Sequence, residues 1–228
     1  TMVLTLAPAA GATVLANSVA TQGQTSISDN DEAKLREFWT QYEVAPSTQN
    51  ALVQKLRAGG TVDALTDGAQ PTSTRTVSSE TDDVTVTSFA DGSIQITGVE
   101  KPLEEAEGAI SPMSVGSCRT SGSGSGYNTY YDCKAYLSNG FVDLGFYITY
   151  TIVAGTGYDY IVEVNSPYAY GIGGTASTPT LAIGRKTEYA GGSAWAYART
   201  SYSGVNGGGR TYEMRALVGS NRTLTIWA

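Results

Sequence analysis

The sequence predicts a mainly β protein, in which an antiparallel β-sandwich at residues 117–228 follows a small helical hairpin and a β-hairpin. Charged residues make up only 15% of the chain, whereas glycine and tyrosine, which suit turns and strands, are abundant. Short candidate strands follow one another in the back half, separated by glycine-rich turns. Strands and helices do not alternate, which disfavours a parallel α/β fold; a closed barrel is the alternative to the sandwich.

Residues 141–153 carry the clearest strand pattern of the chain. Apolar side chains alternate there with polar or small ones, as a half-buried strand requires. The apolar set is Val142, Leu144, Phe146, Ile148, Tyr150 and Ile152. Asn139-Gly140 predicts the turn that joins this strand to the preceding one at 127–137. Further strands are predicted at 158–164, 180–189, 193–203, 210–218 and 222–227.

Residues 21–99 are predicted to form an acidic N-terminal segment that opens with a helical hairpin at 31–58. The first helix has an apolar stripe at helical spacing, made of Leu35, Phe38, Trp39 and Tyr42. Asp29 is expected to cap this helix. Pro46 opens the second helix, and Gly59-Gly60 ends it.

A β-hairpin is predicted at 83–97 of the same segment. Asp91-Gly92 forms its turn, and the apolar residues on either side share one face. These residues are Val84, Val86, Ile94 and Ile96. A third strand is expected at 74–78.

The composition changes near residue 110. Residues 1–110 hold 15 acidic and 6 basic residues, giving a charge of −9, whereas residues 111–228 hold 6 acidic and 8 basic residues, giving +2. All tyrosines except Tyr42 lie in the back half. We therefore predict two units joined by an acidic linker at 100–116.

Residues 1–20 resemble a signal peptide, because an apolar stretch ends in the small-x-small pattern Ser18-Val19-Ala20. An apolar strand or helix of the mature fold is the alternative. Cys118 and Cys133, the only cysteines, are predicted to form a disulfide, because an even pair in an exported chain suggests one. Two free thiols and a two-thiolate metal site are the alternatives, but the metal site would lack supporting ligands. We expect a secreted, extracellular protein without a membrane partner in its mature form, because no apolar run could span a bilayer.

Several classes of function are excluded or disfavoured. The chain has no histidine, which excludes Ser-His-Asp and Cys-His catalysis and histidine-ligated metal sites. A net charge of −7 disfavours nucleic acid as a partner. Residues 171–176 match a dinucleotide-binding fingerprint, but a predicted strand follows instead of a helix, so we interpret them as a glycine loop. The Ser/Gly run 121–126 is interpreted as a flexible tip. We predict no cofactor and no metal.

Aromatic side chains of the back half are the candidate ligand-binding residues. They are Tyr130, Tyr136, Tyr168, Tyr170, Trp195 and Tyr197. Some lie on the strand phase opposite the expected core, where a flat ring with a polar rim can stack on a sugar or anchor a protein. The competing explanation is that partly buried tyrosine is ordinary in strands.

Catalysis would have to use carboxylates. The back half offers Asp132, Asp143, Asp159, Glu163, Glu188 and Glu213. A glycosidase needs two that converge, and nothing in the sequence pairs any two of them, so no catalytic residue is assigned.

Five segments of the front resemble uncharacterised secreted proteins of Gram-positive bacteria. They are Leu35-Arg-Glu-Phe-Trp-Thr-Gln-Tyr-Glu-Val44, Thr48-Gln-Asn-Ala-Leu52, Lys55-Leu56, Asp67-Gly-Ala-Gln-Pro71 and Phe89-Ala-Asp-Gly-Ser93. In those proteins, similar segments precede a disulfide-bearing β domain. The resemblance implies export and a two-part architecture, and it carries no active-site residue.

Three functions are compatible with these observations. We prefer a secreted, non-catalytic binding or adhesion protein that contacts cell-wall polysaccharide or an extracellular protein through its tyrosines. The first alternative is a secreted toxin or bacteriocin-like β protein whose acidic front is a pro-segment. The second is a small carboxylate-dependent hydrolase.

Overall fold

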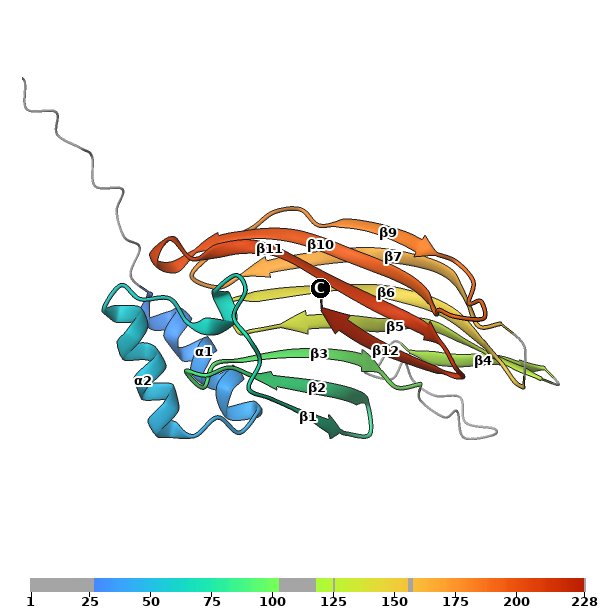
Figure 1. Ribbon diagram of the computed structural model, residues 1–228, viewed down its shortest axis with the longest axis horizontal. Helices are drawn as coiled ribbons and strands as arrows, with labels where there is room; N and C mark the ends of the chain where they lie inside the picture. Colours follow the sequence, from blue (N-terminus) through green and yellow to red (C-terminus); the bar gives the residue numbers. More distant parts are fainter. Residues whose placement is uncertain (1–26, 103–117, 125, 156–157, 228) are drawn as a thin grey trace, which may run out of the picture.

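The structure, a computed structural model, describes residues 27–102, 118–124, 126–155 and 158–227, with the backbone alone for 121–124 and 224–227. It confirms the mainly β fold: two antiparallel sheets face each other, and two helices lie at one end (Figure 1). The predicted leader at 1–20 and residues 103–116 of the predicted linker lie outside the described residues.

The larger sheet has seven strands in the order β1-β2-β3-β5-β6-β7, with β4 paired to β5 as well. The strands are β1 Ser73–Ser78, β2 Asp82–Ser88, β3 Ile94–Glu100, β4 Arg119–Gly124, β5 Tyr127–Ser138, β6 Val142–Val153 and β7 Tyr160–Gly171. β3 and β4 share one edge of the long strand β5: β3 pairs with residues 135–138 and β4 with residues 127–131.

The smaller sheet has five strands in the order β12-β11-β10-β8, with β9 paired to β10 as well. The strands are β8 Gly174–Ala176, β9 Thr180–Arg185, β10 Ala194–Gly204, β11 Gly209–Gly219 and β12 Arg222–Trp227. The core lies between the sheets, where the apolar face of β6 meets the buried alanines of β10 and β11. The strand predicted at 141–153 is present as β6, and five of its six predicted apolar residues are buried; Ile152 is partly buried, and Gly145, Thr149 and Thr151 on the opposite phase are buried as well.

The β-hairpin of the acidic front belongs to the larger sheet. β3 pairs with β5 from Ile96↔Ser138 to Val99↔Ala135, and β2 and β1 continue the sheet outward. The prediction that the sandwich is confined to residues 117–228 is therefore too narrow, since its first strand begins at Ser73. Composition misplaced this boundary because sheet pairing uses main-chain groups, which are the same in both halves.

Two short strands lie where the sequence predicts loops. β4 occupies most of the Ser/Gly run that was expected to form a flexible tip, and β8 lies inside the glycine loop 171–176. Glycine-rich segments carry no hydrophobic alternation, yet their main chains pair here with the edges of β5 and β10. β9 rather than a helix follows the glycine loop, as the sequence predicts.

The predicted helical hairpin consists of α1 (Asp29–Gln41) and α2 (Pro46–Arg57). Leu35 and Trp39 are fully buried, so the apolar stripe of α1 is a packing face. The expectation that Asp29 caps α1 is wrong. Ser28 has an extended backbone and accepts the N–H of Asp31 at 3.1 Å, which places Asp29 inside the first turn.

The helices close the end of the sandwich at which several turns meet. Leu35 and Phe38 of α1 lie against Gly140 in the turn between β5 and β6. Asn206, in the short helix η2 (Val205–Gly207) between β10 and β11, donates from Nδ2 to the carbonyl oxygens of Leu56 and Gly60, at 2.7 and 2.8 Å. Carbonyl groups near a helix C-terminus need partners outside the helix, and the back half supplies one.

Asp91 joins the turn between β2 and β3 to the helical segment. Its carboxylate accepts the N–H of Asp63, which opens the short helix η1 (Asp63–Leu65), at 2.8 Å, and forms an ion pair with Lys55 of α2 at 2.9 Å. Ser93 donates to it through both its hydroxyl and its N–H. Burial alone would raise the pKa of Asp91, but these hydrogen bonds outweigh burial and hold the pKa below its usual value.

We predict that Asn206→Ala lowers the free energy of unfolding by about 2 kcal/mol, because two hydrogen bonds to the end of α2 are lost. Asn221→Ala is the matched control: both asparagines have positive φ, at 57° and 58°, but Asn221 is exposed in a turn. Urea unfolding of both variants separates loss of docking from backbone strain. Equal losses in the two variants would show that Asn206 acts only through its backbone conformation.

A second prediction concerns pH. Since the pKa of Asp91 is lowered in the folded state, the stability that it contributes is present above the usual carboxyl pKa, about pH 4, and is lost as pH falls through the lowered folded value. Asp91→Asn should cost about 2 kcal/mol at neutral pH and progressively less in acid. The exposed Asp67→Asn should cost little at any pH. An Asp91→Asn deficit that stays constant between neutral pH and acid would contradict this account.

Candidate functional site

Tyrosine and glycine alternate across four strands of the larger sheet. Gly98 on β3, Tyr136 on β5, Gly145 on β6 and Tyr168 on β7 are successive cross-strand partners, so they share the outer face of the sheet. The hydroxyl end of each ring fills the space that a Cβ would occupy at its neighbouring glycine, Tyr136 at Gly98 and Tyr168 at Gly145. The rings therefore lie along the sheet surface. We call these four residues the tyrosine row.

A groove of about 530 Å³ lies along the tyrosine row. The back half contributes Lys134, Asp143, Tyr170 and the two rings of the row to its lining. The acidic front contributes Phe38, Gln41, Tyr42, Asp82, Ile96 and Glu100. The outer face of the sheet forms the floor, and the C-terminal part of α1 forms a wall. The groove therefore exists only because the two halves of the chain share one sheet.

The two rings of the tyrosine row lie against a cation, and one of them stacks on a further tyrosine ring. The ammonium group of Lys134 lies 5.1 Å from the ring centroid of Tyr136 and 5.5 Å from that of Tyr168. Tyr170 stacks on Tyr168, with 5.5 Å between centroids and 30° between planes. Tyr170 is 64% exposed, so its ring offers the most accessible aromatic surface of the groove.

Three carboxylates surround these rings, against one ammonium group. Asp82 accepts the hydroxyl of Tyr136 at 3.1 Å, and Glu100 Oε2 accepts the backbone N–H of Lys134 at 3.0 Å. Asp143 is the direct cross-strand partner of Tyr170 and shares its face of the sheet. The groove therefore carries a net negative charge.

The ionisation of the tyrosines reflects this environment. Burial, followed by the Asp82 carboxylate, raises the pKa of Tyr136 well above its usual value. Burial and then Asp143 raise the pKa of Tyr168 in the same way, and burial, Asp82 and Asp143 raise that of Tyr42. This environment holds the phenols of Tyr42, Tyr136 and Tyr168 in their neutral form, which donates hydrogen bonds.

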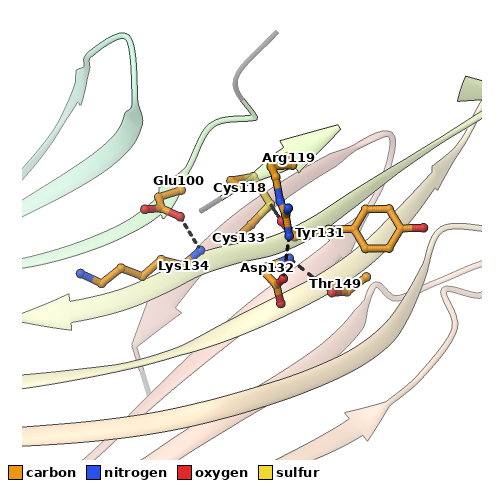
Figure 2. Close-up of a disulfide and its surroundings, with 8 residues drawn as sticks. All are labelled: Glu100, Cys118, Arg119, Tyr131, Asp132, Cys133, Lys134 and Thr149. Atoms are coloured by element: carbon orange, nitrogen blue, oxygen red, sulfur yellow. Dashed lines mark hydrogen bonds and ion pairs between the residues drawn. A yellow bond between two sulfur atoms is a disulfide. The ribbon is translucent and has the colours of Figure 1, made fainter. Parts of the chain in front are cut away.

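The predicted disulfide between Cys118 and Cys133 is confirmed and lies close to the groove (Figure 2). β5 has a bulge directly before Cys133, where Asp132 adopts a φ of 51°. Arg119 of β4 forms an ion pair with Asp132 at 3.5 Å. The disulfide and this ion pair hold β4 against β5 at Asp132 and Cys133, the two residues that precede the groove residue Lys134 in the chain.

The six predicted aromatic residues do not form one surface. Tyr136, Tyr168 and Tyr170 converge in the groove, whereas Tyr130 packs on Tyr150 with 5.0 Å between ring centroids. Simple alternation would place Tyr130 and Tyr136 on the same face, but the bulge between them turns Tyr130 to the inner face.

Trp195 and Tyr197 lie on the outer face of the smaller sheet, since the flanking alanines of β10 are buried. Arg215 lies 4.8 Å from the ring of Trp195. Glu213 forms ion pairs with Arg215 and with Arg199, which lies against Tyr197. These two aromatic residues therefore belong to a separate cluster, whose buried carboxylate is already paired with two arginines.

Of the six carboxylates considered for catalysis, only Asp143 lines the groove. Asp159 and Glu188 lie together, but each accepts two backbone N–H groups at distances of 2.8 to 3.2 Å. Asp159 is only 1% exposed. Each of the four carboxylate oxygens accepts one of these N–H groups, so the pair holds neighbouring turns together.

Lys134 and the groove residues of the acidic front were not predicted from the sequence. Asp82 and Glu100 stand at the outer ends of the β-hairpin, where a solvated carboxylate is the ordinary expectation. One signal was present: Gly145 occupies an outward position of a regular strand, and Gly98 interrupts another. Glycine inside a strand marks the close approach of another group, which here is a tyrosine ring.

We predict that Gly145→Ala lowers the free energy of unfolding by about 1–2 kcal/mol, because the new methyl group collides with the Tyr168 ring. In a Tyr168→Ala background the same substitution should cost nothing or stabilise the strand, since alanine loses less backbone entropy than glycine on folding. A double-mutant cycle in urea measures this coupling. Additive effects would show that the ring does not rest on Gly145.

In the part of the chain that the structure describes, no three histidine, cysteine, aspartate or glutamate side chains converge to hold a metal ion, and no helix is long and apolar enough to cross a membrane. The resemblance to secreted proteins of Gram-positive bacteria stays a prediction. No family model matches the chain, and no curated protein or solved structure matches it. Its function therefore has to be inferred from the groove.

Proposed function

We propose that this chain is an extracellular, non-catalytic binding protein and that the groove binds cell-wall polysaccharide. The observation that carries the proposal is the convergence of four tyrosine rings with three carboxylates in one groove. Rings that lie along a sheet offer flat apolar surfaces on which a sugar can stack. Beside the rings, carboxylates can accept hydrogen bonds from the hydroxyl groups of a sugar, and neutral phenols can donate hydrogen bonds to them.

The dimensions of the groove suit such a ligand. Its volume of about 530 Å³ falls within the roughly 300–1,000 Å³ that is typical of small-molecule sites. The ring of Tyr170 remains largely exposed at the surface of the groove. An open groove with an exposed ring can engage an internal stretch of a polymer, whereas a closed cavity could take only its end.

An extracellular location is supported by the disulfide between Cys118 and Cys133, since such bonds persist in oxidising compartments. The signal-peptide-like composition of residues 1–20 agrees with it. Both observations fit a protein that meets polysaccharide outside the cell.

The two alternative functions have less support. A toxin released from an acidic pro-segment would have to lose the front half, which supplies β1, β2 and β3 of the larger sheet and several residues of the groove. A hydrolase would need two carboxylates in distinct acid and base roles. Asp82 receives the Tyr136 hydroxyl and Glu100 receives a backbone N–H, so both are already used to position groove residues.

We predict that Tyr170→Ala lowers the affinity for insoluble cell-wall polysaccharide at least tenfold, because the most exposed ring of the groove is lost. Its effect on stability should be small, since the side chain is mostly exposed. Tyr127→Ala is the matched control, because Tyr127 is 46% exposed on β5 and lies outside the groove. Co-sedimentation with purified wall material measures both variants. Equal binding by Tyr170→Ala and the parent chain would rule out the groove as the site.

A further inference from the structure

We propose that the groove selects sugars that carry a protonated amine, so that its ligand class is glycans with free amino groups, such as glucosamine polymers, rather than their N-acetylated forms. This inference rests on the proposed function and specifies its ligand. It rests on three features of the groove: a carboxylate that has no partner among the described residues, an exposed ring beside that carboxylate, and a net negative charge.

Asp143 is the carboxylate of the groove without a partner. Asp82 receives the Tyr136 hydroxyl, and Glu100 receives the backbone N–H of Lys134. Within the residues that the structure describes, the Asp143 carboxylate has no hydrogen-bond donor and no cation against it, although its residue is half-buried. A carboxylate without a donor in the groove can accept an incoming cation without first giving up a bond within the protein, and such a charge-assisted hydrogen bond is stronger than a neutral one.

The position of Asp143 couples this charge to the most exposed ring. Asp143 and Tyr170 are direct cross-strand partners on the outer face, and such partners have Cβ atoms about 4.5–5.5 Å apart. A sugar stacked on Tyr170 therefore has its ring substituents within reach of the Asp143 oxygens. An ammonium substituent can form a charge-assisted hydrogen bond there, which an N-acetyl group in the same position cannot match.

The rings of the groove already lie against one ammonium group of the chain itself. Lys134 Nζ lies between the rings of Tyr136 and Tyr168, at 5.1 and 5.5 Å from their centroids. By formal charge, the lining of the groove holds three carboxylates and one ammonium group. Burial is the main cause of the raised pKa of Tyr42 and of Tyr168; Asp82 and then Asp143 add to it at Tyr42, and Asp143 adds to it at Tyr168, because a carboxylate opposes a further negative charge on a phenol. The field of the groove thus favours a cationic ligand over a neutral one of the same shape.

The test is a calorimetric titration of the full chain with glucosamine oligomers and with N-acetylglucosamine oligomers of equal length, at low salt and about pH 5.5, which lies between the ordinary pKa of a carboxyl group and that of an amine. We expect the glucosamine oligomers to bind at least tenfold more tightly and to lose this advantage as salt is added. Asp143→Asn should abolish the preference. Glu163→Gln is the matched control, since it removes one exposed carboxylate from the same sheet outside the groove, and it should keep the preference.

Equal affinity for the two oligomers, or tighter binding of the N-acetylated form, would overturn the amine selectivity. If Tyr170→Ala still weakened binding to wall polysaccharide in that case, the groove would remain a glycan site and only the inference about the amine would fail. If Glu163→Gln removed the preference as completely as Asp143→Asn, the selectivity would come from overall charge and not from the groove, which would also overturn the inference. Thermal unfolding of both variants checks that they are folded.

Discussion

The pairing of β3 with β5 is the interaction on which the rest of the structure depends. It joins the acidic front and the tyrosine-rich back in one sheet through main-chain hydrogen bonds. The same pairing places Gly98 opposite Tyr136 and brings Glu100 to the backbone of Lys134. The groove lies across this strand pairing, with α1 as a wall. Carboxylates of the acidic front and tyrosine rings of the back half, which are separated along the sequence, therefore lie close together in space.

Rings that lie over glycines occur on both outer faces of the sandwich, but the two faces differ in their charges. Trp195 lies over Gly184 on the smaller sheet, and Arg215 covers it. Glu213 beside it is buried and bound by two arginines, so that cluster is complete without a ligand. In the groove of the larger sheet, Asp143 is left without a partner among the described residues. This difference in charge supports the choice of the groove, where the tyrosine rings and the carboxylates converge, over the cluster around Trp195.

Much of this architecture could be predicted from the sequence, whereas the site could be predicted only in part. Helices and strands follow from local periodicity, as the alternation around Phe146 and the stripe through Trp39 illustrate. The groove depends on long-range pairing, which local patterns do not encode. Tyr130 shows the limit clearly: its strand was predicted, but an unrecognised bulge at Asp132 turned its ring inward. Asp82 could not be assigned to the site, because nothing in the sequence reveals that β3 pairs with β5.

The most direct test of the account is to map where a glycan binds. Backbone amide signals of the isotope-labelled full chain can be followed by NMR while soluble cell-wall fragments are added. The account predicts that the shifts concentrate at 134–136, 143–145 and 168–170, with smaller changes at Asp82 and the C-terminal part of α1. Shifts concentrated around Trp195 on the opposite face, with the groove unaffected, would contradict it.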